Sequence, residues 1–166
     1  PLPLPLQSGS DRVLKRMRRG YLSADYRAAV ERLRDAVPEL AITTDIIVGF
    51  PSETAAEFEE TRTFMETIGF DNAFVFKYSP RPGTPAAAWE DDVSDDEKLR
   101  RNKVLLDDQD QRGRRLNEQL VGNVVEVMVE GESLRNSARW SGRSRTNKIV
   151  VFDPVPGCEV GDLIRV

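Results

Sequence analysis

The sequence has 166 residues, of which 39% are hydrophobic and 31% charged, with a formal net charge of −4 at pH 7. These values are typical of a soluble globular protein with room for one domain and a small second one. The chain has no histidine, which excludes the usual zinc sites and His-based triads. The single Cys158 excludes internal disulfides and indicates a reducing, cytoplasmic compartment. We expect neither a membrane span nor a signal peptide.

The first part of the chain alternates short apolar runs with helical patterns. Leu2–Leu6 reads as a strand, and because proline has no N–H to donate, its alternate prolines predict pairing on one side at most. A short basic helix follows, with Ser10 or Asp11 as its cap. The next helix begins at Ser23 and ends before Pro38.

The middle of the chain repeats the alternation of strand and helix. Leu40–Gly49 is rich in β-branched residues and predicts a strand buried on both faces. Thr54 and Glu57 form a capping-box pattern for a helix that ends at Gly69. Ala73–Phe76 is the next strand. This order predicts a parallel sheet with right-handed crossovers.

The pattern changes near residue 120. A long polar helix, capped by Ser94 with Glu97, ends there. Three short strands separated by Gly, Asn, Ser and Pro then follow, at Val124–Val129, Lys148–Phe152 and Leu163–Val166. The predicted domains are therefore an α/β domain over 1–119 and a small antiparallel barrel or sandwich over 120–166.

Three Gly- or Pro-containing loops, at residues 7–10, 49–53 and 78–84, open directly from predicted strands of the α/β domain. Ligands of parallel α/β folds sit at the carboxyl ends of the strands, so these loops are candidate ligand contacts. Their polar side chains are Gln7, Ser8, Asp45, Glu53 and Ser79. Each loop alone is more often an ordinary turn than a ligand contact. Asp45 can be a satisfied structural carboxylate, and Glu53 can simply cap the following helix.

Cations are unevenly distributed along the chain. One basic cluster lies in the short helix near residues 12–19, and another lies in the tail between Arg135 and Lys148. In the tail, the cations surround Trp140, a ring that could stack on an unpaired base. The alternative for either cluster is a solvated face of the protein.

Taken together, the three loops and the tail resemble one known family. The segments 4–10, 43–54 and 76–85 are similar, in order and spacing, to the radical S-adenosylmethionine methylthiotransferases. Segment 142–148 resembles the TRAM domain of the branch that modifies tRNA (the MiaB type) more than the branch that modifies a ribosomal protein (the RimO type). Ser52 stands where the family commonly has Gly, and Pro3 where it commonly has His.

The resemblance implies a fold and a reaction. The chain would be the C-terminal part of a longer enzyme, made of the last three strands and helices of a radical SAM (β/α) barrel followed by a TRAM barrel. The implied reaction is methylthiolation of a tRNA adenosine at C2, with S-adenosylmethionine and two four-iron clusters as cofactors. The family's cluster cysteines are absent and Cys158 matches none of them, so we expect the chain alone to ligate no metal and to be inactive.

The resemblance also assigns residues. No catalytic residue is carried over from the family. The implied cofactor contacts are Gln7, Ser8, Asp45, Gly49, Glu53, Tyr78 and Ser79. The implied RNA contacts are Arg139, Trp140, Arg143, Arg145 and Lys148. Two alternatives remain open, namely an RNA-binding module without chemistry and an enzyme acting on a ribosomal protein. Because three strands cannot close a barrel, the first strand should be an exposed edge that permits self-association.

Overall fold

The computed structural model describes residues 1–166 and divides the chain into two compact units, Leu2–Leu116 and Asn117–Val166. The first unit is α/β and the second is all-β. No helix in the chain is long and apolar enough to cross a membrane. The coarse fold prediction, a parallel α/β part followed by an antiparallel part, is confirmed.

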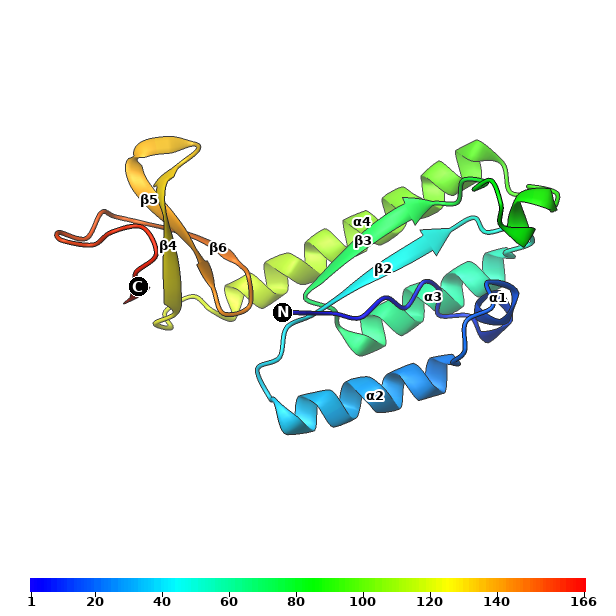
Figure 1. Ribbon diagram of the computed structural model, residues 1–166, viewed down its shortest axis with the longest axis horizontal. Helices are drawn as coiled ribbons and strands as arrows, with labels where there is room; N and C mark the ends of the chain where they lie inside the picture. The colour runs from blue at the N-terminus through cyan, green and yellow to red at the C-terminus, as the bar shows by residue number, and fades with distance from the viewer. The chain divides into compact units, whose positions relative to one another are not determined.

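The first unit is built on a three-stranded parallel sheet (Figure 1). Its strands are β1 (Leu2–Pro3), β2 (Ile42–Val48) and β3 (Asn72–Lys77), in the order β1-β2-β3. An isolated bridge between Gln7 and Ile46 extends the pairing beyond β1. The sheet is open, and β1 forms one edge as expected.

The alternate prolines limit β1 to pairing on one side. The N–H groups of Leu2 and Leu4 donate to the carbonyl oxygens of Ala41 and Thr43, both at 2.8 Å. Pro3 has no N–H to offer on the opposite side. The regular strand is therefore shorter than the predicted Leu2–Leu6. Self-association through this edge stays a prediction.

Helices build the core on one face of the sheet (Figure 1). The helices that form this core are α2 (Ser23–Ala36), α3 (Ala55–Ile68) and α4 (Asp95–Glu118). The unit also contains the short helix α1 (Asp11–Arg16) and a 3-10 helix, η1 (Pro85–Ala88). The core combines Ile42, Ile46 and Val48 of β2 with apolar side chains of α2, α3 and α4.

The predicted burial of β2 on both faces is wrong. Its even-numbered residues are buried, but Thr43, Asp45 and Ile47 are only partly covered. The reason is that α2, α3 and α4 all pack on the even-numbered face. The other face is left available to line a cavity.

The predicted caps of α3 and α4 are confirmed. The predicted cap of α1 is wrong, because the Ser10 side chain makes no capping hydrogen bond and the Asp11 carboxylate accepts from the Ser23 N–H. The Thr54 hydroxyl accepts from the Glu57 N–H, and the Glu57 carboxylate accepts from the Thr54 N–H at 2.8 Å, which is the predicted capping box at the start of α3. Gly69 ends that helix with φ +66°. The Ser94 hydroxyl accepts from the Glu97 N–H at the start of α4.

The second unit is a four-stranded antiparallel sheet in the order β6-β5-β4-β7. Its strands are β4 (Glu126–Ser133), β5 (Asn136–Ser144), β6 (Ile149–Phe152) and β7 (Leu163–Arg165). The sequence patterns located β4, β6 and β7 but missed β5, which is polar and lies in the basic tail. The edge strands β6 and β7 are not paired with each other, so this sheet is open.

Candidate functional site

A cavity of about 710 Å³ opens at the carboxyl ends of β2 and β3. Four of the seven residues predicted to contact a cofactor line it: Gln7, Asp45, Tyr78 and Ser79. They come from the three loops and strands that the sequence singled out, although those segments are far apart along the chain. Parallel pairing produces this meeting, because it brings the carboxyl ends of neighbouring strands to one edge.

Gln7 has an unusual backbone conformation at the mouth of this site. Its φ is +73°, in a region that residues other than glycine rarely occupy. Two ladder bonds with β2 fix it there, from the Gln7 N–H to the Asp45 carbonyl at 2.8 Å and from the Ile47 N–H to the Gln7 carbonyl at 2.9 Å. Backbone strain of this kind is concentrated at functional sites.

Ser8 does not line the cavity. Its side chain is buried against α3, where the Ser8 and Thr61 hydroxyls lie 3.1 Å apart. The Gly9 N–H also donates to the Thr61 hydroxyl, and the Ser10 N–H donates to Ser8 Oγ. These bonds fix the loop after β1 on α3, so Ser8 positions the loop that carries Gln7.

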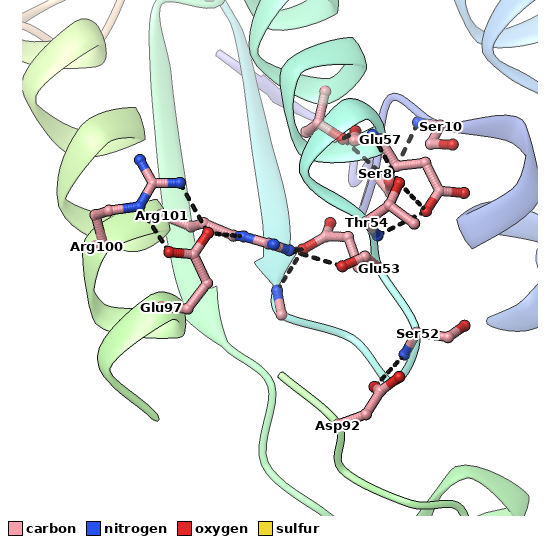
Figure 2. Close-up of polar contacts among 12 residues, drawn as sticks. Ser8, Ser10, Ser52, Glu53, Thr54, Glu57, Asp92, Glu97, Arg100 and Arg101 are labelled. Carbon is pink, nitrogen blue, oxygen red and sulfur yellow. Dashed lines mark hydrogen bonds and ion pairs between the residues drawn. The ribbon is translucent and has the colours of Figure 1, made fainter. Parts of the chain in front are cut away.

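Glu53 and Gly49 also lie outside the cavity wall, and they join the loop after β2 to helix α4 (Figure 2). Glu53 is only 3% exposed, and its Oε2 accepts from the Gly49 N–H at 2.6 Å and from Arg101 Nη1 at 2.8 Å. Arg101 also donates to the Glu53 carbonyl and to Glu97. Burial raises the pKa of Glu53, while the bonds from Gly49 and Arg101 oppose that rise. In this arrangement Glu53 holds its loop in place.

The same loop contains two residues with left-handed backbone. Gly49 has φ +70°, and a Cβ built there would lie 2.3 Å from Cγ of the buried Lys98. Ser52 has φ +66°, and its N–H donates to Asp92 at 2.6 Å (Figure 2). The left-handed conformation explains why glycine is the ordinary residue at position 52 in the family that the sequence resembles.

Sequence reasoning missed an aromatic cluster beside the cavity. The Phe50 ring packs edge-on against Tyr78 at 5.1 Å and against Trp89 at 5.9 Å between ring centres. Arg16 stacks over Trp89, with its guanidinium carbon 4.5 Å from the ring centre. Phe50 lies in the loop after β2, one of the predicted ligand contacts. No local sequence pattern indicated that Trp89 or Arg16 would be its neighbours.

The predicted RNA contacts of the tail lie on and beside β5, and three of them form ion pairs with acidic residues. Arg139 pairs with Asp153, Arg143 with Glu130 and Arg145 with Glu126. The Lys148 ammonium donates to Asn117 at 2.7 Å. Trp140 is partly buried against the apolar core of this sheet. The tail contains no acid in sequence, but the fold pairs three of its cations with acids from outside the tail.

The chain has no group of three or more His, Cys, Asp or Glu side chains that could hold a metal ion. The cavity therefore offers hydrogen-bonding, aromatic and cationic groups to a ligand. Its chemistry suits an organic cofactor better than a bare metal ion.

Comparison with known proteins shows which family the chain resembles. The model of the radical SAM superfamily matches residues 2–65. The chain is 47% identical over 149 residues to a tRNA-2-methylthio-N(6)-dimethylallyladenosine synthase of Methylacidiphilum infernorum, which covers 90% of this chain. It is 50% identical over 152 residues to the synthase of the same name from Akkermansia muciniphila, and 42% over 165 residues to that of Shewanella denitrificans, covering 92% and 99% of the chain. The chain spans about a third of the length of these relatives (32%, 33% and 35%). The chain is therefore similar to part of a radical SAM methylthiotransferase.

Proposed function

We propose that this chain is part of an enzyme that uses S-adenosylmethionine to methylthiolate a tRNA adenosine at C2. The cavity at the carboxyl ends of β2 and β3 carries the proposal, since ligands of parallel α/β folds bind at that edge. The name shared by the relatives supports a tRNA substrate over a ribosomal protein. In this proposal, residues 1–119 are the last part of the barrel, and the reaction takes place in the cytoplasm.

The residues of the cavity fit S-adenosylmethionine. Asp45 can accept hydrogen bonds from ribose hydroxyls or from an ammonium group, and Gln7 and Ser79 add an amide and a hydroxyl. Ile47 offers apolar surface to the planar adenine. The volume lies within the range of roughly 300–1,000 Å³ found for small-molecule sites. When bound, S-adenosylmethionine would supply the radical and the methyl group.

The residues do not fit an iron–sulfur cluster. Such clusters are held by several Cys thiolates, and Cys158 is the only cysteine of the chain. We therefore expect other parts of the enzyme to hold the clusters, and the chain alone to have no methylthiolation activity.

Residues 120–166 are proposed to be a TRAM domain that binds tRNA. The antiparallel sheet and the cations on and beside β5 support this assignment. The proposed contacts are Arg139, Trp140, Arg143, Arg145 and Lys148. Since phosphate contacts release counterions, we expect tRNA binding to weaken as salt rises and to weaken further in the Arg143→Ala/Arg145→Ala variant. Unchanged affinity of that variant would count against the tail as an RNA surface.

A chimera tests the enzymatic proposal. The matching third of the Acetivibrio thermocellus relative, which is 44% identical over 165 residues, would be replaced by this chain. Methylthiolated adenosine in tRNA would then be measured by mass spectrometry after reconstitution. We expect an active chimera, and a loss of roughly tenfold to a hundredfold in activity when Asp45 becomes Ala, the size of a lost hydrogen bond to a charged group.

Binding to the unmodified chain separates the enzyme from an RNA-binding module. S-adenosylhomocysteine should bind the 166-residue chain, and Asp45→Ala should weaken that binding. An RNA-binding module without chemistry would show no such binding, and a folded chimera without activity would overturn the proposed reaction.

A further inference from the structure

The wall of the cavity carries charge of almost one sign. Arg16, Arg18, Arg19, Lys77 and Arg81 line it. The only acid in the wall is Asp45. The cations come from two segments, one at the end of α1 and the other at the end of β3, and together these five residues form the rim.

None of the five rim cations makes an ion pair within the chain. Scarcity of acids is not the reason, because the chain has 28 acids and 24 bases. Arg139, Arg143 and Arg145 of the tail, by contrast, each have a carboxylate partner. Unmatched like charges gathered around a cleft raise the local concentration of anions and indicate an anionic ligand.

The rim is also held in position by the fold. The Arg18 N–H donates to the Lys15 carbonyl, the Arg19 N–H donates to the Leu14 carbonyl, and Arg18 takes a left-handed φ of +56°. Arg16 is stacked over Trp89, and its Nε is buried without a hydrogen-bond partner. The segment at the end of α1 therefore presents its three cations from a fixed backbone.

An exposed aromatic ring lies among these cations. Phe76 lines the same cavity and is 53% exposed, directly before Lys77. A cationic groove combined with an aromatic surface is the usual arrangement for binding single-stranded nucleic acid, where the cations follow the phosphates and rings stack on bases. A single carboxylate, such as that of a bound amino-acid moiety, would need only one or two of the five cations.

We propose that the rim binds the backbone phosphates on both sides of the nucleotide that enters the cavity. This inference rests on the proposed function, because it takes RNA as the substrate. It assigns to the strand ends of the first unit an RNA contact separate from the one proposed for the tail.

The test measures RNA binding to the 166-residue chain. A fluorescent single-stranded RNA that contains adenosine would be titrated by anisotropy at salt concentrations from about 50 to 200 mM. The rim variant Arg18→Ala/Arg19→Ala/Arg81→Ala removes three exposed cations. The matched tail variant Arg139→Ala/Arg143→Ala/Arg145→Ala removes three paired ones. The tail variant also matches the change in net charge, and Arg32→Ala is the control for loss of one exposed, unpaired cation away from the rim, on α2.

We expect the rim variant to lower affinity by at least roughly tenfold at low salt. The slope of log affinity against log salt should fall by about two, since each lost contact to a single strand removes about 0.7. Arg32→Ala should change neither quantity. A Lys-for-Arg version of the rim variant should keep most of the slope, and thermal unfolding should show that all variants fold.

The outcomes distinguish failure of the rim contact from failure of the proposed RNA substrate. RNA binding by the unmodified chain with an unchanged slope in the rim variant overturns the rim contact alone. Failure of the unmodified chain to bind RNA overturns the RNA substrate and the rim contact with it. S-adenosylhomocysteine binding gives the third arm, and it should be the same in the rim variant. Loss of S-adenosylhomocysteine binding in the rim variant would assign the cations to the cofactor and overturn the rim as a contact for RNA phosphates.

Discussion

Replacing Arg101 by Met should unfold the first unit far more readily than the same change at Arg100. The two arginines are neighbours on α4 and both pair with Glu97. The Arg101 side chain is 5% exposed and also pairs with Glu53, whereas the Arg100 side chain is 53% exposed. Burial therefore distinguishes two changes that are chemically identical.

The magnitude follows from what each variant leaves behind. Without Arg101, the Glu53 carboxylate stays buried and keeps only the bond from the Gly49 N–H. Breaking a buried ion pair from one side costs about 3–5 kcal/mol, a large share of the roughly 5–15 kcal/mol that stabilises a domain. Without Arg100, Glu97 keeps Arg101, so the expected cost is at most about 1 kcal/mol.

The pH dependence gives a second signature. The folded pKa of Glu53 is already raised by burial, and it should rise further in Arg101→Met. A raised folded pKa of an acid favours folding below its unfolded value, near 4.5, and this contribution is lost as pH rises through the folded value. Arg101→Met should therefore lose more stability near pH 7 than near pH 4.

The assay is urea unfolding followed by far-UV circular dichroism, which reports the helices. A double variant, Arg101→Met/Glu53→Gln, removes the charge that Arg101 balanced and should recover part of the loss. The reasoning is refuted if Arg101→Met costs no more than Arg100→Met, or if its cost is the same at both pH values.

Three further changes test the loop between β2 and α3 and the cap that follows it. Ser52→Gly should stabilise the fold by about 1 kcal/mol relative to Ser52→Ala, since only glycine adopts φ +66° without strain; equal stabilities in urea would contradict this. Gly49→Ala should cost more than about 2 kcal/mol, because a strained φ and a contact with Lys98 combine, and a cost below about 0.5 kcal/mol would show that the loop relaxes. Pairing with Arg12 lowers the pKa of Glu57 to about 2 from 4.5, so its stabilisation is present above pH 4.5 and is lost as pH falls through 2. Glu57→Gln should flatten that acid limb in unfolding measured at several pH values, and an unchanged limb would assign it to other carboxylates.

Local signals in the sequence predicted local structure well. The Thr54 and Glu57 cap, the end of α3 at Gly69 and the one-sided pairing of the proline strand are all set within a few residues. Strand β5 was missed because it has no apolar alternation of its own. It forms because β4 and β6 pair with both of its edges, which a local window cannot register.

In the candidate site, too, some features follow from the local sequence and others depend on distant residues. Parallel strand order predicted that these strand ends would meet, and Gln7, Asp45, Tyr78 and Ser79 do line one cavity. The roles of Ser8 and Glu53 depended on Thr61 and Arg101, which lie 53 and 48 residues away. No sequence pattern indicated those partners, although each candidate lay in the correct loop.

Charge is where the fold changes the interpretation most. A run of cations without acids between them, as in the tail, was the strongest sequence signal for RNA. Antiparallel pairing brings Glu126 and Glu130 of β4 beside Arg145 and Arg143, so much of that charge is balanced inside the sheet. The cations of the rim, at the ends of α1 and β3, have no carboxylate partner in the chain. What attracts an RNA phosphate is the charge left unpaired after folding, and by that measure the mouth of the cavity is at least as strong a candidate RNA contact as the tail.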